Sequence, residues 1–287
     1  MFSRINIKKL VLWLVIIFVC SVSLGTAVLF AKGDIPFVNT SENTREIDEE
    51  KVFPVEGIKN INVSTVSSDI KIIPVESGEI KVHYYGSVSG KGDVPELVTE
   101  VSGDGLDVRI KHYKRPVKMF SFYMYKLNID IYVPKGYSNS LKLTTVSGKI
   151  TTGDINLHNL ALSSVSGDLN ISGAATKNIV ASTTSGNANL NSVSGNAKLS
   201  SVSGNITAEF LRLESDISIS TVSGNSRISL PENADFEVNF NTTSGNFNSN
   251  FPLEIGDHSK RNVSGKTGSG KNTIQVKSVS GDLEIKK

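Results

Sequence analysis

The stretch Leu160-Ala-Leu-Ser-Ser-Val-Ser-Gly-Asp-Leu-Asn-Ile171 holds one unit of the pattern that decides the fold. Its first two leucines lie at even positions, whereas Val165, Leu169 and Ile171 lie at odd positions. Side chains alternate along a strand with a period of two, so this change of parity requires a bulge or a turn. We expect Gly167 to form that corner by adopting a positive φ, with apolar side chains facing the interior on both sides.

The corner tripeptide recurs along the chain: Val-Ser-Gly occurs nine times and Thr-Ser-Gly twice. From residue 141 onward the corner glycines are 19, 19, 18, 20 and 21 residues apart, and Gly195 lies midway in one interval. Two strands of about 5 to 6 residues and two turns fill such a unit. Repeats of this length indicate stacked β-units. The sequence therefore predicts an all-β protein, a β-solenoid or β-helix-like stack with coils of about 19 residues.

Stacking at the usual strand separation of about 4.8 Å would place each Ser-Gly-Asn corner on the previous one, and would align Ser and Asn side chains in ladders. Calcium-binding nonapeptide rolls are the alternative, because Gly186, Gly195 and Gly204 are nine residues apart. Those rolls need a regularly placed Asp, which the corners lack. We therefore interpret the repeat as structural.

The N-terminal region contains an uncharged run from residue 10 to residue 31, after three basic residues. At 1.5 Å per residue it would reach about 33 Å, enough to cross a bilayer core of about 30 Å. A signal peptide cleaved after Gly25-Thr-Ala27 is the alternative, but the apolar run continues to Ala31. We expect a cytoplasmic tail at 1–9, a transmembrane signal anchor at 10–31, a stalk at 32–55 and an exported domain at 56–287.

Composition agrees with an extracellular, single-pass protein of the cell membrane. Cys20 is the only cysteine, so no intrachain disulfide can form. The formal charge of +2 arises from the N-terminus: without the four basic residues in 1–32, 26 basic and 28 acidic residues remain. That balance does not favour nucleic acid as a partner.

Catalytic and metal chemistry find little support in the sequence. The histidines are scattered and show no metal-ligand spacing; they are His83, His112, His158 and His258. Thr267-Gly-Ser-Gly-Lys271 lacks the spacing of a phosphate loop. Asp154, Asp168 and Asp216 lie near corners without recurring in register, although a glycan-cleaving solenoid would need paired carboxylates. We predict no catalytic, cofactor-binding or metal-binding residue, and no cofactor.

One segment differs from the repeat, because residues 111–126 combine basic, aromatic and methionine side chains. A contact surface for anionic lipid or wall polymer is one interpretation. Its candidate residues are Lys114, Arg115, Lys118, Phe120, Phe122, Tyr123 and Tyr125. The other interpretation is a hairpin whose Phe120, Phe122 and Met124 cover the open end of the solenoid.

Three features together resemble a known family: Val66-Ser-Ser-Asp-Ile70, then Leu127-Asn-Ile-Asp-Ile-Tyr-Val-Pro-Lys-Gly136, then serial Ser-Gly-Asn and Ser-Gly-Asp corners. They resemble the bacterial β-strand-repeat proteins described as adhesins of unknown function. The layout is similar to that of membrane-anchored proteins of Gram-positive bacteria linked to the cell-envelope stress response.

The resemblance implies a non-enzymatic envelope interaction or scaffold module. Its partners would be the membrane, and beyond it a cell-wall polymer, a membrane protein or further copies of the chain. Two alternatives stay open at this point. One is an accessory sensor of cell-wall stress that works with a neighbouring membrane protein, and the other is a polysaccharide-active β-helix enzyme.

Overall fold

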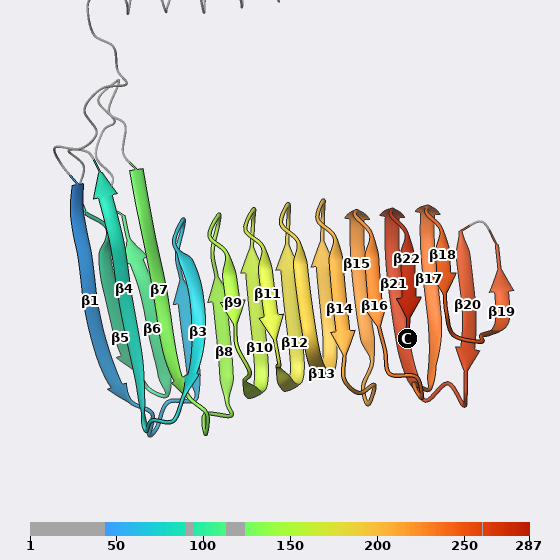
Figure 1. The fold of residues 1–287 in the computed structure, drawn as a ribbon, viewed down its shortest axis with the longest axis horizontal. Helices are drawn as coiled ribbons and strands as arrows, with labels where there is room; N and C mark the ends of the chain where they lie inside the picture. The colour runs from blue at the N-terminus through green and yellow to red at the C-terminus, as the bar shows by residue number, and fades with distance from the viewer. Residues whose placement is uncertain (1–43, 90–93, 113–123, 260) are drawn as a thin grey trace, which may run out of the picture. The chain divides into compact units, whose positions relative to one another are not determined.

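The computed structural model describes residues 44–89, 94–112, 124–259 and 261–287 (Figure 1). In these ranges every regular element is a β-strand, and none is a helix long and apolar enough to span a membrane. The all-β expectation is therefore confirmed. The expected anchor at 10–31 lies outside the described residues. Residues 45–287 form one compact unit, which is described below.

Two sheets face each other along this unit, and every coil contributes to both. In stacking order, sheet A consists of β1 (Thr44–Pro54), β4 (Glu79–Ser89), β7 (Met124–Pro134), β3 (Asp69–Val75), β9 (Ile150–Thr152), β11 (Leu169–Ser172), the first half of β13 (Ala188–Ser201), β14 (Ile206–Phe210), β16 (Ser226–Ser229), β22 (Leu283–Lys286) and β18 (Phe247–Ser249).

Sheet B consists of β5 (Glu96–Ser102), β6 (Gly105–Lys111), β2 (Asn60–Ser64), β8 (Ser140–Thr144), β10 (Asn156–Ser164), β12 (Ala175–Thr183), the second half of β13, β15 (Ile217–Ser223), β21 (Asn272–Ser280), β17 (Phe236–Ser244), β20 (Asn262–Thr267) and β19 (Glu254–His258).

The central coils stack in sequence order with parallel pairing. Asn159 of β10 lies between Ser140 and Asn178, each 19 residues away, and its amide bonds to both. The step is 18 residues from Ser182 to Ser200 and 20 residues from Asn205 to Asn225. These offsets equal the spacings of the corner glycines. The ladders therefore show one coil per sequence repeat in this part of the chain.

Both ends of the stack depart from sequence order. The coil of β2 and β3 lies between β6 and β7 on one side and β8 and β9 on the other. Likewise the coil of β21 and β22, which carries the chain's C-terminus, lies between β15 and β16 and the later-stacked β17 and β18 (Figure 1). Antiparallel pairs follow at the ends, namely β4 with β7 and β5 with β6 at one end, and β17 with β20 and β19 with β20 in sheet B at the other, where sheet A ends with the parallel strand β18.

The core lies between the two sheets and is built from alternate side chains of each strand. In the central unit, Leu160 and Leu162 of sheet B and Leu169 and Ile171 of sheet A are all at most 2% exposed. Full burial of such a side chain contributes about 1.5–3 kcal/mol. The predicted alternation is confirmed for these four residues.

The corners close through a side-chain bond to the backbone. At four successive corners, the Ser or Thr that precedes Val-Ser-Gly or Thr-Ser-Gly is buried, and its hydroxyl accepts the N–H of the glycine three residues later. The bond is 2.7 Å from Gly167 N to Ser164 Oγ and 2.8 Å from Gly204 N to Ser201 Oγ. Such local bonds favour turns over continued strands. This bond explains why a Ser or Thr stands three residues before the glycine in these corner tetrapeptides.

The expected reason for the corner glycines was wrong. None of the glycines that stack at the corners, including Gly167, has a positive φ. A Cβ on Gly167 would instead overlap the carbonyl oxygen of Gly148, and one on Gly186 would overlap that of Gly167. The corner backbones are stacked too closely for any side chain, which is the other use of glycine. Positive φ occurs at Gly195, in the opposite bend within β13.

The corner valines also differ from expectation, because Val165 faces outward. It is 48% exposed, and its counterparts Val146, Val202 and Val222 are 44–46% exposed. The parity change therefore takes place between residues 164 and 169, with the valine on the outside of the turn.

The C-terminal part of the expected stalk is also a strand. Residues 44–54 form β1, which pairs with β4 at the end of sheet A. The acidic residues around Ile47 concealed this strand, because only Ile47 of the eleven residues is buried.

Candidate functional site

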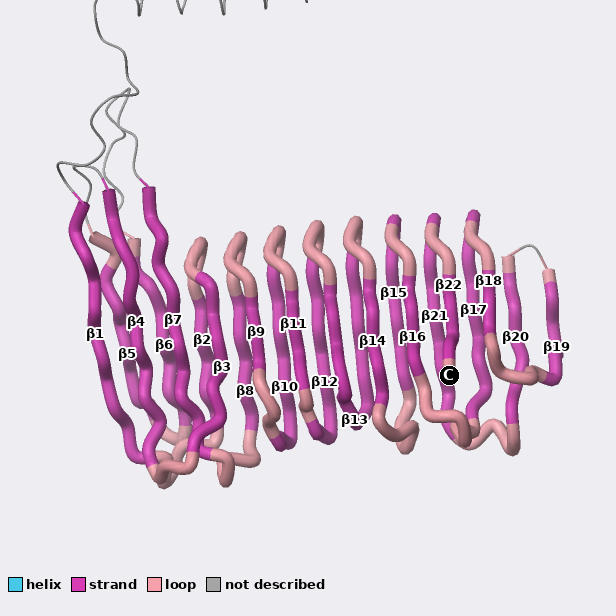
Figure 2. The backbone as a smooth tube through the Cα atoms, in the orientation of Figure 1, coloured by secondary structure: helices cyan, strands magenta, loops and turns pink. Residues whose placement is uncertain are grey.

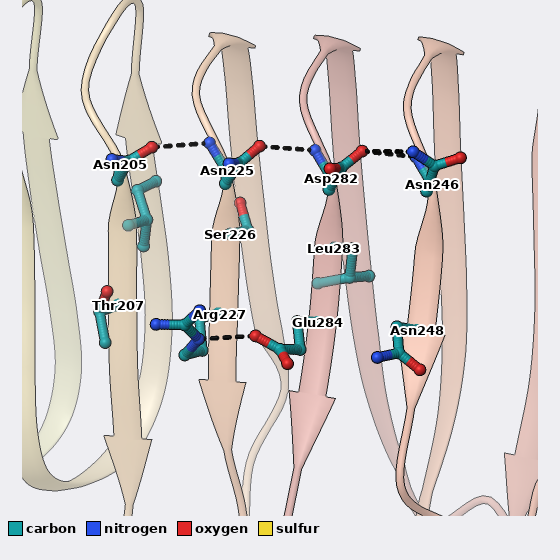
Figure 3. Close-up of a pocket in the computed structure, with 11 residues that line it drawn as sticks. Asn205, Thr207, Asn225, Ser226, Arg227, Asn246, Asn248, Asp282, Leu283 and Glu284 are labelled. Atoms are coloured by element: carbon teal, nitrogen blue, oxygen red, sulfur yellow. Dashed lines mark hydrogen bonds and ion pairs between the residues drawn. The ribbon is translucent and has the colours of Figure 1, made fainter.

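A groove crosses the outer face of sheet A where β14, β16, β22 and β18 lie side by side (Figure 3). It has a volume of about 350 Å³. We call it the amide groove. Its lining residues are Asn205, Ile206, Thr207, Asn225, Ser226, Arg227, Asn246, Asn248, Asp282, Leu283 and Glu284. Three coils contribute the residue after the corner glycine and the next two residues along the strand, and the fourth coil contributes Asn246 and Asn248.

One wall of the amide groove is a ladder of amide and carboxylate side chains. Asn205 Oδ1 accepts the N–H of Asn225 at 2.9 Å, and Asn225 Oδ1 accepts that of Asp282 at 2.9 Å. Asp282 Oδ1 accepts both the backbone N–H and the side-chain amide of Asn246, at 2.7 and 3.1 Å (Figure 3). The predicted Asn ladder is confirmed here. It satisfies backbone donors at the corners, which is the usual fate of such groups.

The ladder uses only half of each side chain. Among the hydrogen bonds of the described residues, none involves Asn205 Nδ2, Asn225 Nδ2 or Asp282 Oδ2. Asn248 and Thr207, lower on the same face, also form no side-chain hydrogen bond with another described residue. The amide groove therefore presents donors and acceptors together, on side chains whose positions are already fixed by the stack.

An ion pair lies at the lower side of the groove. Arg227 Nε donates to Glu284 Oε2 at 2.7 Å, and Lys286 Nζ lies 3.0 Å from Glu284 Oε1. These two cations, Arg227 first, lower the pKa of Glu284 below its usual value. Glu284 is therefore an ionised acceptor at neutral pH, and its negative charge offsets the positive charge of Arg227.

A second groove of about 410 Å³ follows the corners on the side of sheet B. It is lined by Ser, Thr and Val from four consecutive coils, including Ser163, Val165, Ser200 and Val202. Its hydroxyls partly bond among themselves, as between Ser182 and Ser200 at 3.1 Å. Small side chains alone line this groove, so it offers less chemical definition than the amide groove.

The predicted contact surface lies mostly outside the described residues. Lys114, Arg115, Lys118, Phe120, Phe122 and Tyr123 fall in 113–123. Tyr125 is described: it lies in β7, is half-buried, packs against the core and meets His112 edge-on with ring centroids 6.0 Å apart. The side chain of Met124, from the alternative cap, is likewise not described.

The histidines occupy separate environments. His83 Nε2 lies 2.7 Å from Asp48 Oδ1, and its ring stacks on Tyr85 with centroids 4.5 Å apart. Burial lowers the pKa of His112. His158 is exposed on β10. Among the described residues, no group of three or more His, Cys, Asp or Glu side chains could hold a metal ion.

Two of the three corner aspartates accept backbone N–H groups. Asp168 Oδ1 accepts the N–H of Asn187 at 2.8 Å, and Asp216 Oδ1 accepts that of Thr273 at 2.8 Å. The carboxylate of Asp154 lies against Gly173, where a Cβ would overlap it. The structure does not bring the three together as a paired acid site.

The glycine-rich loop Thr267–Lys271 joins β20 to β21 and holds a carboxylate of this chain. Asp235 accepts the Lys271 N–H at 2.9 Å and the Ser269 hydroxyl at 2.7 Å. These bonds, the Lys271 N–H first, lower the pKa of Asp235 to about 2. Donors that could otherwise face a phosphate are thus already used.

Sequence reasoning missed the amide groove, although its signal was present. Each corner glycine is followed by Asn, Asp or Lys, and the second residue after that is polar in the coils of Thr207, Arg227 and Asn248. What could not be read was that the coil of residues 282–284 enters between those of 225–227 and 246–248.

In comparisons with known proteins, a family model matches most of the chain. The family model Toastrack DUF4097 matches residues 58–286. No curated protein matches the sequence. A candidate adhesin from Bacteroides fragilis is 14% identical, with a TM-score of 0.46 and coverage of 86% of this chain and 98% of that one. A candidate cell adhesion protein from Clostridium sporogenes is 15% identical, with a TM-score of 0.39 and coverage of 84% and 99%. A candidate lipid-binding protein from Parabacteroides distasonis is 13% identical, with a TM-score of 0.36 and coverage of 87% and 99%.

Proposed function

The chain belongs to the Toastrack DUF4097 family, and we propose that it is a non-enzymatic, adhesin-like interaction module of the cell envelope. Residues 10–31 anchor it in the cell membrane with the N-terminus in the cytoplasm, and the β domain faces the exterior. The module acts in the envelope stress response by holding a wall polymer or a membrane protein against its outer face.

The amide groove is the observation that carries this proposal. Its polar side chains come from four stacked strands and are held by ladder bonds of 2.7–3.1 Å, so they are ordered before any partner arrives. Preorganised groups lose little conformational freedom on binding. The acids of this face are engaged in ladder bonds or ion pairs, which suits a binding surface better than acid-base catalysis.

The location is tested with a single introduced cysteine. Ser203 is exposed at a corner, and Cys20 is the only native cysteine. In intact cells, a membrane-impermeant thiol reagent should label the full-length Ser203→Cys protein and leave the parent protein unlabelled. Labelling of Ser203→Cys only after lysis would overturn the extracellular placement.

The interaction is tested by sedimentation of the detergent-solubilised full-length protein with purified cell walls, and by crosslinking in intact cells. Binding to walls, or specific crosslinking to a membrane protein, supports an interaction module. Crosslinking to a membrane protein without binding to walls favours the sensor alternative. If the folded, exposed protein neither binds walls nor crosslinks to a partner, the proposal is contradicted.

A further inference from the structure

We infer that the amide groove binds an uncharged linear glycan, laid along the stacking direction across β14, β16, β22 and β18. The inference rests on the proposed function and names the class of partner that this site recognises. Four properties of the groove lead to it, and each excludes a different kind of ligand.

The first property is the mixture of unused donors and acceptors. The amide nitrogens of Asn205 and Asn225 and the second oxygen of Asp282 carry no hydrogen bond from another described residue. A hydroxyl group both donates and accepts, so neighbouring hydroxyls of a sugar can use an amide and a carboxylate in turn. A ligand with only one of these capacities would leave half of the groove unpaired, which is unfavourable once water is displaced.

The second property is the balance of charge. Arg227 is paired with Glu284 at 2.7 Å, and Asp282 adds an unpaired negative charge to the lining. Lys286 is paired with Glu284, not with Asp282. An anionic polymer would meet two carboxylates and a single, already neutralised guanidinium. A neutral polymer meets no such repulsion, and the carboxylates strengthen hydrogen bonds from its hydroxyls.

The third property is the state of the backbone. β14, β16 and β22 each pair on both sides, and β18 pairs with β22. The N–H and C=O groups of β14, β16 and β22 are therefore used within the sheet, and of the four strands only β18 keeps a free edge, so an extended peptide could not pair with the other three as a further strand. Side-chain groups remain for recognition, which favours a polyol over a peptide main chain.

The fourth property is the repeat distance. Neighbouring strands are about 4.8 Å apart, so four coils span about 14 Å along the stack. One coil advances by nearly the length of one unit in an extended β-1,4-linked glycan. Each sugar would thus lie against one coil, and the groove accommodates about three to four units.

The test measures binding of neutral tetrasaccharides to the detergent-solubilised full-length protein by ligand-observed NMR titration. The probes are tetra-N-acetylchitotetraose and cellotetraose, and poly(glycerol phosphate) serves as the anionic comparison. The test variant is the double substitution Thr207→Val and Asn248→Ala, because neither side chain holds the fold by a hydrogen bond within the described residues. The control is Gln275→Ala, an exposed position on the outer face of sheet B.

The expected result is binding of at least one neutral tetrasaccharide, weakened about 10- to 30-fold by the double substitution and unchanged in Gln275→Ala. Stronger binding of poly(glycerol phosphate), or equal binding by wild type and the double variant, would overturn the inference. Wall binding without tetrasaccharide binding would overturn it too, while the proposed function stands. Absence of both wall binding and a crosslinked membrane protein would instead count against the proposed function itself.

Discussion

The central coils and the two ends of this molecule build the same kind of unit by different routes. From β8 to β16, each coil stacks on the one that precedes it in sequence. At both ends, the coil that is nearest the end of the β domain in sequence does not lie at the end of the stack. At the N-terminal end, strands β4 to β7 cover the coil of β2 and β3, although they follow it in sequence. At the C-terminal end, strands β17 to β20 cover the coil of β21 and β22, although they precede it in sequence (Figure 2).

The difference shows how the ends of such a stack of strands are covered. A stack built only in sequence order would leave its last parallel strands as open edges. Here the C-terminal coil is paired on both sides, and antiparallel strands lie at both ends of sheet B and at the N-terminal end of sheet A, whereas sheet A ends at its other side with β18, parallel to β22. Cooperativity at the ends therefore depends on contacts between residues far apart in sequence, whereas in the centre it depends on contacts about 19 residues apart.

Removal of residues 272–287 should have the largest effect and tests the interleaved end directly. The deletion takes away four fully buried side chains: Ile274, Val276, Leu283 and Ile285. At about 1.5–3 kcal/mol each, at least about 6 kcal/mol of local stability is lost. Hydrogen exchange should show lost protection in β15 to β18, with β8 to β12 still protected as the internal control. Full protection of β17 would mean that it can pair directly with β15.

A methyl group in the corner column should have the next largest effect and tests the central coils. Gly167→Ala places a Cβ against the carbonyl oxygen of Gly148, and two coils must separate to admit it. We expect the free energy of unfolding to fall by about 3–5 kcal/mol. The matched control is Gly136→Ala, at an exposed turn with open space around the new methyl. Denaturant unfolding of both variants decides, and equal stabilities would refute the close-approach explanation.

Loss of a corner hydroxyl should have a smaller effect. Ser201 Oγ accepts the N–H of Gly204 at 2.8 Å, and Ser201 is 4% exposed. Ser201→Ala leaves this buried N–H unpaired, which costs about 1–3 kcal/mol. Ser203→Ala, at the exposed position of the same corner, should change stability by less than about 0.5 kcal/mol. A Ser201→Ala protein as stable as Ser203→Ala would show that the hydroxyl bond does not hold the corner.

The smallest effect concerns pH at the C-terminal end. Because hydrogen bonds lower the pKa of Asp235 to about 2 from its usual 3.8, the carboxylate stabilises the folded state above about pH 4. That contribution is lost as the pH falls from about 4 through about 2. Asp235→Asn should therefore be less stable at neutral pH, and the difference from wild type should shrink over this range. An unchanged difference down to pH 2 would contradict the assignment.

Prediction from sequence succeeded where neighbouring residues decide the outcome. The alternation that buries Leu160 and Leu169 is a property of single strands, and the stacked Asn side chains follow from the constant spacing. It failed for Val165, because a turn residue between two strands obeys neither alternation. It also failed for the reason behind Gly167, since a close approach between coils is invisible in one coil.

The order of the coils could not be predicted, because β17 and β21 carry similar corners and either could follow β15. Phe236 and Phe240 distinguish β17 in three dimensions. Phe236 packs edge-on against Phe251 at 5.2 Å, and Phe240 lies 6.2 Å from Phe247. Such large rings suit the end of the stack, where β20 covers them, whereas the aliphatic side chains of β21 fit between two coils.

The sequence by itself determined the β class, the repeat length, the corner tetrapeptide and the ladders, because alternation, the Ser or Thr hydroxyl bond and constant spacing all act locally. Tertiary structure alone decided the order of the end coils and, with it, the amide groove. Its four strands come from residues 205–284 in an order that the chain does not follow. The physical reason is that nearly identical coils can pair in many orders, and only the fit of buried side chains across coils selects one.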